Sequence, residues 1–180
     1  MRMNKDTKKW LALVACSITL CAIACGSKGT MEAQMRTQER NKAVIRKWFT
    51  EVNKDNFESL YEECFDRDCK QYMPPNAEPV GFEEYKPMAR GIYESFPEID
   101  HQITDLIAEG DRVVATIWVR TMHEGAFFGI PATGKNLEWT SIAVFRLAEG
   151  KIKARWEIAD VQGILEQLES ESIITVRRDP

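Results

Sequence analysis

Two long segments of alternating apolar and polar residues, 112–122 and 136–147, stand on either side of a connection rich in glycine and proline. Alternation with a period of two is typical of β-strands that bury one face, and two such runs in succession predict an antiparallel pair. Four glycine or proline residues shape the connection, 123–134. We therefore expect a structured loop rather than a tight two-residue hairpin turn.

This connecting loop is unusually apolar for a surface segment, because it contains Phe127, Phe128 and Ile130. Apolar side chains gain free energy when they leave water, so the loop is expected to cover either the core or a cavity. His123 stands where the first strand enters the loop, which makes it a candidate site residue.

Periodicity also predicts the remaining elements. Residues 100–109 and 151–158 alternate like strands, and the pairs at 110–111 and 149–150 are tight-turn signals. Apolar residues at three- and four-residue steps predict helices at 37–52, 57–64, 81–96 and 160–168, and a short run predicts a strand at 69–73. Helices followed by antiparallel strands indicate an α+β fold, with one curved sheet and helices on one side.

The first 24 residues differ from the rest of the chain. Four basic residues precede an almost uncharged apolar run from Trp10 to Ala24. A run of about 15 residues is shorter than the ~20 of a spanning helix and favours a signal peptide, with a permanent membrane anchor as the alternative. Removing residues 1–24 changes the net charge from −4 to about −7, which argues against nucleic acid as a partner.

The segment from Ala22 to Ser27 resembles a bacterial lipoprotein lipobox, although Ala22 stands where leucine is usual. The resemblance implies that Cys25 carries a lipid, with Cys16 as the less favoured alternative. The chain then divides into a signal peptide (1–24), a tether (25–36), one domain (37–169) and a tail (170–180). We expect an exported protein that its lipid holds to the bacterial cell envelope.

Cys64 and Cys69 are the two cysteines expected in the mature domain. In an oxidising compartment they could form a small disulfide; the alternative is a pair of thiols near a helix end.

Several motifs together resemble the SnoaL-like polyketide cyclase (ester cyclase) family over about residues 38–168. They are His123-Glu124-Gly125, the Gly-Ile-Pro-Ala-Thr-Gly run ending at Gly134, Phe145-Arg146 with Gly150-Lys151-Ile152, Trp156, Asp160 and Gln167-Leu168. The resemblance implies a cone-shaped, cystatin-like α+β barrel of the nuclear-transport-factor-two-like type, usually dimeric, with a pocket between sheet and helices. It also implies intramolecular aldol closure without metal or cofactor, with an acid near the end of the last strand as general base.

Strand alternation selects the acid. Ile152 to Ile158 alternate with charged residues, and continuing the pattern places Asp160 on the apolar, interior face and Glu157 on the charged, solvated one. Asp160 is also the position that the resemblance implies for the base. Against Trp156 its carboxylate would be poorly hydrated, which raises the pKa toward a value useful for proton abstraction. The alternative is that Asp160 only caps the last helix.

His123 shares the parity of the apolar residues in its strand, so its ring is expected to point inward. There it could polarise a substrate carbonyl or orient Asp160, or it could be a hydrogen-bonded core residue. Candidate substrate-binding residues are Trp156, Tyr72, Trp139, Phe127 and His101. Two histidines and scattered acids lack metal-ligand spacing, and we expect no cofactor.

These observations support two hypotheses. The first is a lipid-anchored, cofactor-free acid–base enzyme, such as an aldol cyclase or a related lyase or isomerase, acting on a small apolar carbonyl compound. The second is a non-catalytic envelope lipoprotein that binds a small apolar ligand in the same pocket. A homodimer is expected in either case from the family resemblance.

Overall fold

The computed structural model describes residues 29–73 and 78–170. A helix occupies residues 29–51, and the elements after it are α2 (Phe57–Cys64), β1 (Phe65–Tyr72), α3 (Phe82–Ser95), β2 (Asp100–Glu109), β3 (Arg112–Met122), β4 (Asn136–Ala148), β5 (Lys151–Ala159) and α4 (Val161–Glu169). The predicted helices and strands are confirmed in type and order. The expected signal peptide (1–24), Cys25 and residues 171–180 of the expected tail lie outside the described residues.

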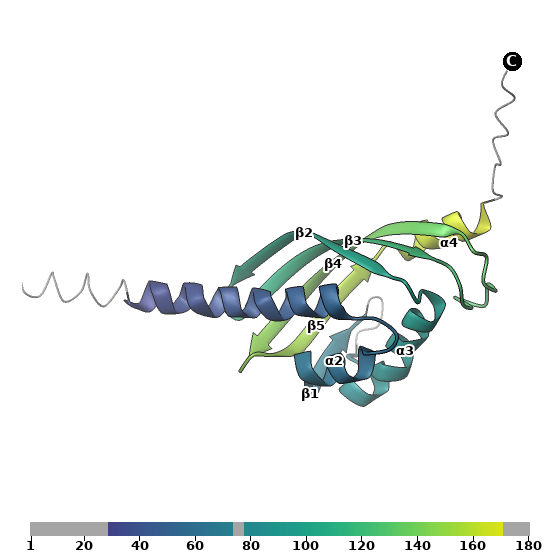
Figure 1. Ribbon diagram of the computed structural model, residues 1–180. Helices are drawn as coiled ribbons and strands as arrows, with labels where there is room; N and C mark the ends of the chain where they lie inside the picture. Colours follow the sequence, from purple (N-terminus) through teal and green to yellow (C-terminus); the bar gives the residue numbers. More distant parts are fainter. Residues whose placement is uncertain (1–28, 74–77, 171–180) are drawn as a thin grey trace, which may run out of the picture.

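The five strands form one curved sheet in the order β1-β5-β4-β3-β2. The α+β class is confirmed, and α2 and α3 lie together on one side of the sheet with helix 29–51 running along it (Figure 1). Neighbouring strands are antiparallel except β1, which runs parallel to β5. β1 and β2 are the two edges and do not pair, so the sheet curves without closing into a barrel.

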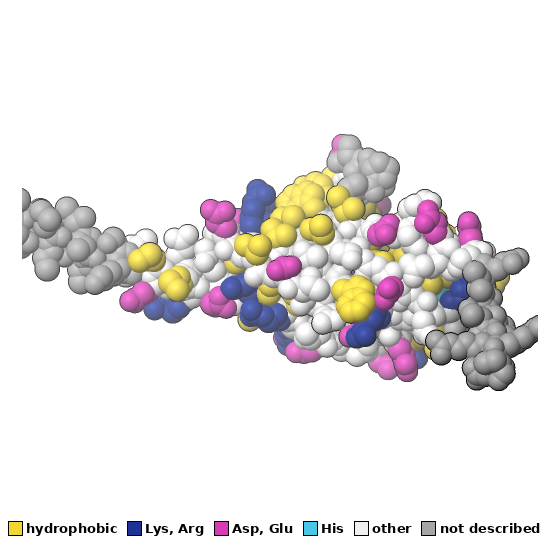
Figure 2. Space-filling model, turned by 90° about the horizontal axis from the view of Figure 1, so that it is seen from above, with side chains coloured by type: hydrophobic (Ala, Val, Ile, Leu, Met, Phe, Trp, Pro, Cys, Tyr) yellow, Lys and Arg dark blue, Asp and Glu magenta, His cyan; other side chains and the backbone are white. Residues whose placement is uncertain are grey.

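The sheet face turned away from α2 and α3 carries exposed apolar side chains. Ile142 on β4 pairs with Ile158 on β5, and the two are 52% and 66% exposed. Val144 beside them pairs with Trp156, whose indole stacks on Tyr72. Figure 2, which views the molecule from above, shows hydrophobic side chains gathered on this outer face.

One local expectation, the start of the first helix, was wrong. Helix 29–51 begins well before the expected start at residue 37, so most of the expected tether (25–36) is helical within the described residues. Asn56 precedes α2 without a capping hydrogen bond from its side chain, because its Oδ1 accepts from the backbone N–H of Asn53 at 2.8 Å.

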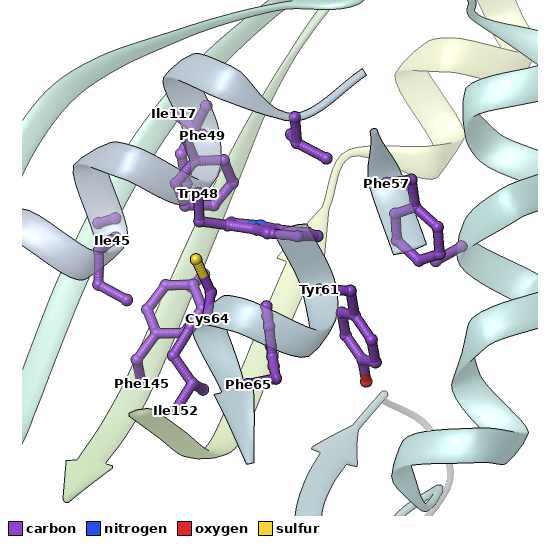
Figure 3. Packing of buried hydrophobic residues seen from close by; sticks show 14 of the residues in the cluster. Ile45, Trp48, Phe49, Phe57, Tyr61, Cys64, Phe65, Ile117, Phe145 and Ile152 are labelled. Atoms are coloured by element: carbon purple, nitrogen blue, oxygen red, sulfur yellow. The ribbon is translucent and has the colours of Figure 1, made fainter. Parts of the chain in front are cut away.

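The core lies between helix 29–51, α2 and the inner face of the sheet. Trp48 projects from the helix toward Phe65, with ring centroids 4.8 Å apart, and toward Tyr61 at 6.0 Å (Figure 3). Fully burying an aromatic side chain of this size contributes about 1.5–3 kcal/mol, so this cluster dominates the stability of the domain.

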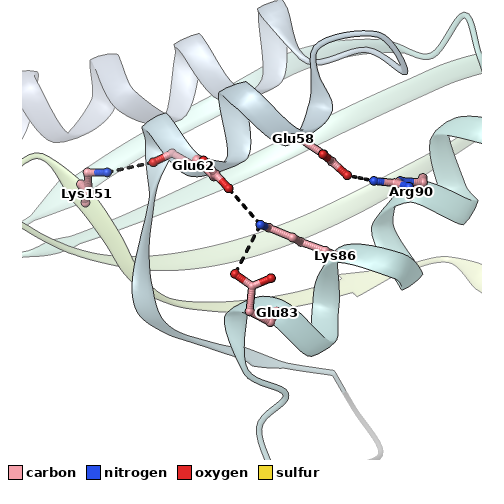
Figure 4. A network of polar contacts seen from close by, with 6 residues as sticks. All are labelled: Glu58, Glu62, Glu83, Lys86, Arg90 and Lys151. Carbon is pink, nitrogen blue, oxygen red and sulfur yellow. Dashed lines mark hydrogen bonds and ion pairs between the residues drawn. The ribbon is translucent and has the colours of Figure 1, made fainter.

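Ion pairs join α2 to α3 at the surface (Figure 4). Lys86 on α3 lies 3.0 Å from the carboxylate of Glu62 on α2, and Arg90 pairs with Glu58 one turn along. Lys151 at the start of β5 donates to the backbone carbonyl of Glu62 at 2.8 Å. Exposed pairs contribute little each, so we assign this network a role in fixing how the two helices lie together.

A β-bulge in β5 decides which of its side chains face the interior. Leu147 on β4 pairs with Ile152, but Phe145, two residues earlier, pairs with Arg155. Lys153 is therefore an extra residue on β5, and the alternation changes phase at this point. Arg155 and Glu157 consequently face inward, whereas the uninterrupted alternation placed them on the solvated face.

Cys64 and Cys69 are both free thiols and both are buried. Burial raises the pKa of Cys64 to about 11 and that of Cys69 to about 12, so both stay protonated at neutral pH. Of the two alternatives from the sequence, the structure shows the pair of thiols. None of the helices within 29–73 and 78–170 is long and apolar enough to cross a membrane.

Candidate functional site

A cavity of about 620 Å³ lies between the inner face of the sheet, α3, the 123–134 loop and the start of α4. Aromatic rings form much of its wall: Trp48, Phe49, Tyr93, Phe96, Phe127 and Trp139. Phe96 holds this wall together, since its ring centroid lies 5.6 Å from that of Trp139 and 4.9 Å from that of Phe127. The cavity therefore favours a small, largely apolar molecule.

The 123–134 loop covers one side of the cavity, as its apolar composition predicted. Its tip is a two-residue turn, because Phe127 and Ile130 exchange backbone hydrogen bonds of 3.0 and 2.9 Å. Phe128 at the turn has φ 47° and is 70% exposed, and it lies at the edge of the cavity. The loop as a whole is structured, but its tip is the tight turn that the composition did not suggest.

The loop is docked on the end of α3. The backbone N–H groups of Glu124 and Gly125 both donate to the carbonyl of Ser95, at 3.0 and 3.1 Å. A Cβ atom on Gly125 would lie 2.5 Å from the carbonyl oxygen of Glu94, so only glycine allows this approach.

Arg155 and Glu157 form a charged pair inside the cavity wall. Arg155 Nη2 pairs with the carboxylate of Glu157, and Nη1 donates to Tyr85 Oη at 2.7 Å. The two side chains are 11% and 22% exposed. Arg155 Nε is buried and has no hydrogen-bond partner among the described residues. Nη1 and Nη2 each carry a second N–H, so the inward guanidinium has donors left for a molecule in the cavity.

His101 lies between the cavity and a second, more polar groove of about 670 Å³ beside β2. Its Nδ1 is buried without a hydrogen bond to any described residue. Burial, and then the positive charge of Arg155, lower the pKa of His101 to about 4. The ring is therefore neutral at neutral pH and can accept or donate a hydrogen bond without carrying charge.

Asp160 occupies the N-cap of α4 rather than the cavity wall. Its Oδ1 accepts from the backbone N–H of Gly163 at 2.9 Å, and the residue is exposed. Its neighbours Ala159 and Val161 line the cavity, so Asp160 stands beside the rim. Trp156, expected next to it, lies on the outer face, where its ring stacks on Tyr72 at 4.6 Å. The interior placement expected for both residues was wrong because of the bulge.

His123 is fully buried, and its side chain holds the loop together. Nδ1 lies 3.0 Å from Thr133 Oγ1 and accepts from the backbone N–H of Thr133 at 3.3 Å. Burial lowers the pKa of His123. Its ring packs behind Phe96, with centroids 5.7 Å apart, so the aromatic wall separates it from the cavity. In the part of the chain that the structure describes, no hydrogen bond joins His123 to Asp160.

The structure thus brings Phe127, Trp139, His101 and Tyr72 to the cavity wall, and leaves Trp156, His123 and Asp160 outside it. Arg155 and Glu157 also line the cavity, although the alternation of β5 predicted that they face solvent. The sequence carries no local signal for this, since charged residues at alternate positions are also the ordinary pattern of a strand face in solvent. The strand order that makes β5 a central strand was not readable from the sequence. Within the described ranges, no group of three or more His, Cys, Asp or Glu residues could hold a metal ion.

The chain is similar to one known family and to several solved structures. The model of the family named SnoaL-like polyketide cyclase matches residues 43–168, and a comparison with curated proteins found no match. A structure from Jannaschia sp. CCS1, provisionally described as a SnoaL-like polyketide cyclase, aligns with a TM-score of 0.69 at 20% identity, over 74% of this chain and 94% of that chain.

Two further structures are similar. IdmH from Streptomyces antibioticus, provisionally described as a polyketide cyclase, has a TM-score of 0.65 at 23% identity, over 72% of this chain and 99% of its own. AclR from Streptomyces galilaeus, provisionally described as a hydroxylase, has a TM-score of 0.63 at 21% identity, over 75% of this chain and 96% of its own. At identities this low the likeness shows a shared fold, and proteins on this fold carry descriptions of different chemistry.

Proposed function

The chain belongs to the SnoaL-like polyketide cyclase family, and we propose that it performs cofactor-free acid–base chemistry on a small, largely apolar carbonyl compound held in the cavity. The observation that carries the proposal is the cavity itself, about 620 Å³ with an aromatic wall and one charged pair. This combination binds an apolar body and leaves a small polar region to act on one functional group.

Proton removal beside a carbonyl needs a base near the carbon and a group that stabilises the resulting oxyanion. Polar groups of both kinds face the cavity: the carboxylate of Glu157, the guanidinium of Arg155 and the neutral ring of His101. The family resemblance assigns the base to Asp160, which stands at the rim. Intramolecular attack of the enolate on a second carbonyl would then close a ring.

The test follows hydrogen exchange in a model compound. Phenylacetone in D₂O is incubated with the purified protein, and loss of its α-proton signals is followed by ¹H NMR. Binding is measured separately with the apolar dye N-phenyl-1-naphthylamine. We expect exchange well above that in buffer, suppressed by the dye. Dye binding without any acceleration of exchange across a set of aryl ketones would rule out the catalytic proposal.

A non-catalytic binding protein is the second candidate, and one observation favours it. The acid–base groups near the cavity are already engaged: Asp160 caps α4, Glu157 pairs with Arg155, and the ring of His123 lies behind Phe96. A cavity that only holds a ligand needs no free base. The exchange experiment separates the two candidates.

We also propose export and lipid anchoring through Cys25, which rest on the lipobox-like sequence alone. Labelling with radioactive palmitate and fractionation of membranes test this proposal. Cys25→Ser is expected to abolish label and release the protein from the membrane fraction, whereas Cys16→Ser is expected to leave both unchanged. Label that survives in Cys25→Ser would contradict the assignment.

A further inference from the structure

Glu157 and Arg155 lie two residues apart on the inward face of β5, because the bulge at Lys153 brings them there. Residues at this spacing on a strand are about 7 Å apart at Cα and point the same way. Both side chains line the cavity. The pair is therefore positioned to meet adjacent atoms of one bound molecule.

Arg155 is held in place from two directions. Tyr85 Oη accepts from Nη1 at 2.7 Å, and the carboxylate of Glu157 pairs with Nη2. A guanidinium has five N–H donors: Nε is buried out of reach of a ligand, whereas Nη1 and Nη2 each carry a second N–H beyond the one that these contacts use. A guanidinium fixed in this way can donate to a ligand oxygen while it keeps its contact with Glu157.

Glu157 is held at one oxygen and open at the other. Its Oε2 pairs with Arg155, and within the described part of the chain Oε1 makes no hydrogen bond or ion pair. Small residues surround its strand position: Ala143 is its partner on β4, and Ala159 and Ser141 follow in the register. The free oxygen is thus accessible from the cavity.

We infer that Glu157 is the catalytic base and that Arg155 stabilises the enolate oxygen in the reaction proposed above, on which this assignment rests. The Glu157 carboxylate takes the proton from the carbon beside the substrate carbonyl. The electron pair of that C–H bond forms the enolate C=C bond, and the carbonyl oxygen takes up the negative charge. In a ring closure the enolate carbon bonds to a second carbonyl carbon, and Glu157 returns the proton to the new alkoxide.

The charge balance explains why a paired carboxylate can serve as the base. Before the step the negative charge next to Arg155 is on Glu157, and after it the charge is on the enolate oxygen. The guanidinium is neutralised at both stages, so no uncompensated charge arises in the cavity, where isolated charges are costly. The assignment implies a substrate whose carbonyl oxygen and acidic carbon lie next to each other at one polar end.

The test compares Glu157→Gln with Glu138→Gln, the same chemical change on the exposed outer face of β4. Exchange of the phenylacetone α-protons is the readout of catalysis, and N-phenyl-1-naphthylamine affinity is the readout of the cavity. Glu157→Gln is expected to lower the exchange rate about 100-fold with dye affinity within about twofold, while Glu138→Gln matches the parent. Arg155→Lys, which keeps the charge and loses the fixed planar donors, is expected to lower the rate about tenfold.

Each outcome decides one question. No exchange by the parent protein would remove the proposed function and this inference together. Exchange by Glu157→Gln within about threefold of the parent would remove the inference alone. Glu157→Asp keeps the charge but moves the carboxylate back by one methylene. If Glu157 is the base, the exchange rate of this variant falls to a level between those of the parent and Glu157→Gln. An exchange rate equal to the parent's in Glu157→Asp would overturn the assignment. So would an equal loss of exchange and of dye binding in Glu157→Asp and Glu157→Gln, because it would show that Glu157 has a structural role only.

Discussion

Phe145 on β4 lies directly opposite Arg155 on β5, so a fully buried aromatic residue and a guanidinium share one face of the sheet. The bulge at Lys153 produces this pairing. It places the charged pair of β5 in the cavity and places Trp156 on the outside. The candidate site of this protein depends on one extra residue in one strand.

The first prediction tests the inward placement of the pair. Leaving one charge of a buried pair unpartnered costs about 3–5 kcal/mol, while replacing both by apolar residues is often neutral. Because Glu157 is partly exposed, we expect Glu157→Leu to lose about 2–3 kcal/mol and the double variant Glu157→Leu/Arg155→Met to recover most of it. Urea unfolding measures both. Glu58→Leu, which makes the same substitution in the exposed pair with Arg90, is the control, expected to change stability by less than about 1 kcal/mol. If the stability losses of the two substitutions simply add in the double variant, the two charges do not interact and the pair lies in solvent.

The second prediction concerns the contact between the loop and α3. Gly125→Ala forces a methyl group against the backbone of Glu94, so we expect a loss of about 1–3 kcal/mol together with weaker dye binding. Gly91→Ala within α3 is the matched control. A Cβ atom there meets nothing within 4 Å, and alanine is the better helix former, so stability should rise by about 0.5–1 kcal/mol. Gly125→Ala with parental stability and dye affinity would contradict the close approach.

The third prediction is a pH dependence of stability from His101. Its folded pKa of about 4 lies below the ordinary histidine value of 6.5, so the unfolded chain binds the proton more readily. The contribution of neutral His101 to the free energy of unfolding is fully present above pH 6.5. It is lost as the pH falls toward 4, by up to about 3 kcal/mol. Unfolding at a series of pH values measures this, and His101→Gln is expected to flatten the curve between pH 6.5 and 4. An unchanged slope in that variant would assign the acid sensitivity to other groups.

The fourth prediction concerns self-association. We propose that the apolar outer face, where Ile142 pairs with Ile158, joins two copies of the chain. Ile142→Glu places a charge at the centre of this face and is expected to give a monomer by light scattering after size exclusion. Met35→Glu, on the exposed side of helix 29–51, is the control and should leave the mass unchanged. A parent protein that is already monomeric would refute the proposal.

The fifth prediction separates the two possible roles of Asp160. An asparagine can cap a helix as well as an aspartate can, so Asp160→Asn should keep its stability, whereas Asp160→Ala should lose about 1 kcal/mol. If Asp160 serves only as the cap, exchange in Asp160→Asn stays within about threefold of the parent. A loss near 100-fold with stability intact would return the role of base to Asp160.

The sequence by itself determined the fold class and the order of its elements. The alternation of β3 and β4 requires one buried face, and the apolar steps of residues 44–52 require a helix on that face. The motifs of the 123–134 loop and of β5 identified the family, and the apolar residues of the loop predicted that it covers either the core or a cavity; it covers a cavity. These features could be predicted because they depend on local sequence periods and on contiguous motifs.

Only the tertiary structure decided which side chains meet in the cavity. The parity of β5 follows from its pairing with β4, and a single bulged residue changes it without leaving a mark in the local alternation. His123 was correctly predicted to point inward, yet the packing of Phe96 separates it from the cavity. Facing inward is a property of one strand, whereas lining a cavity depends on every element packed around it. For that reason the sequence selected Asp160 and the structure brings Glu157 and Arg155 to the cavity.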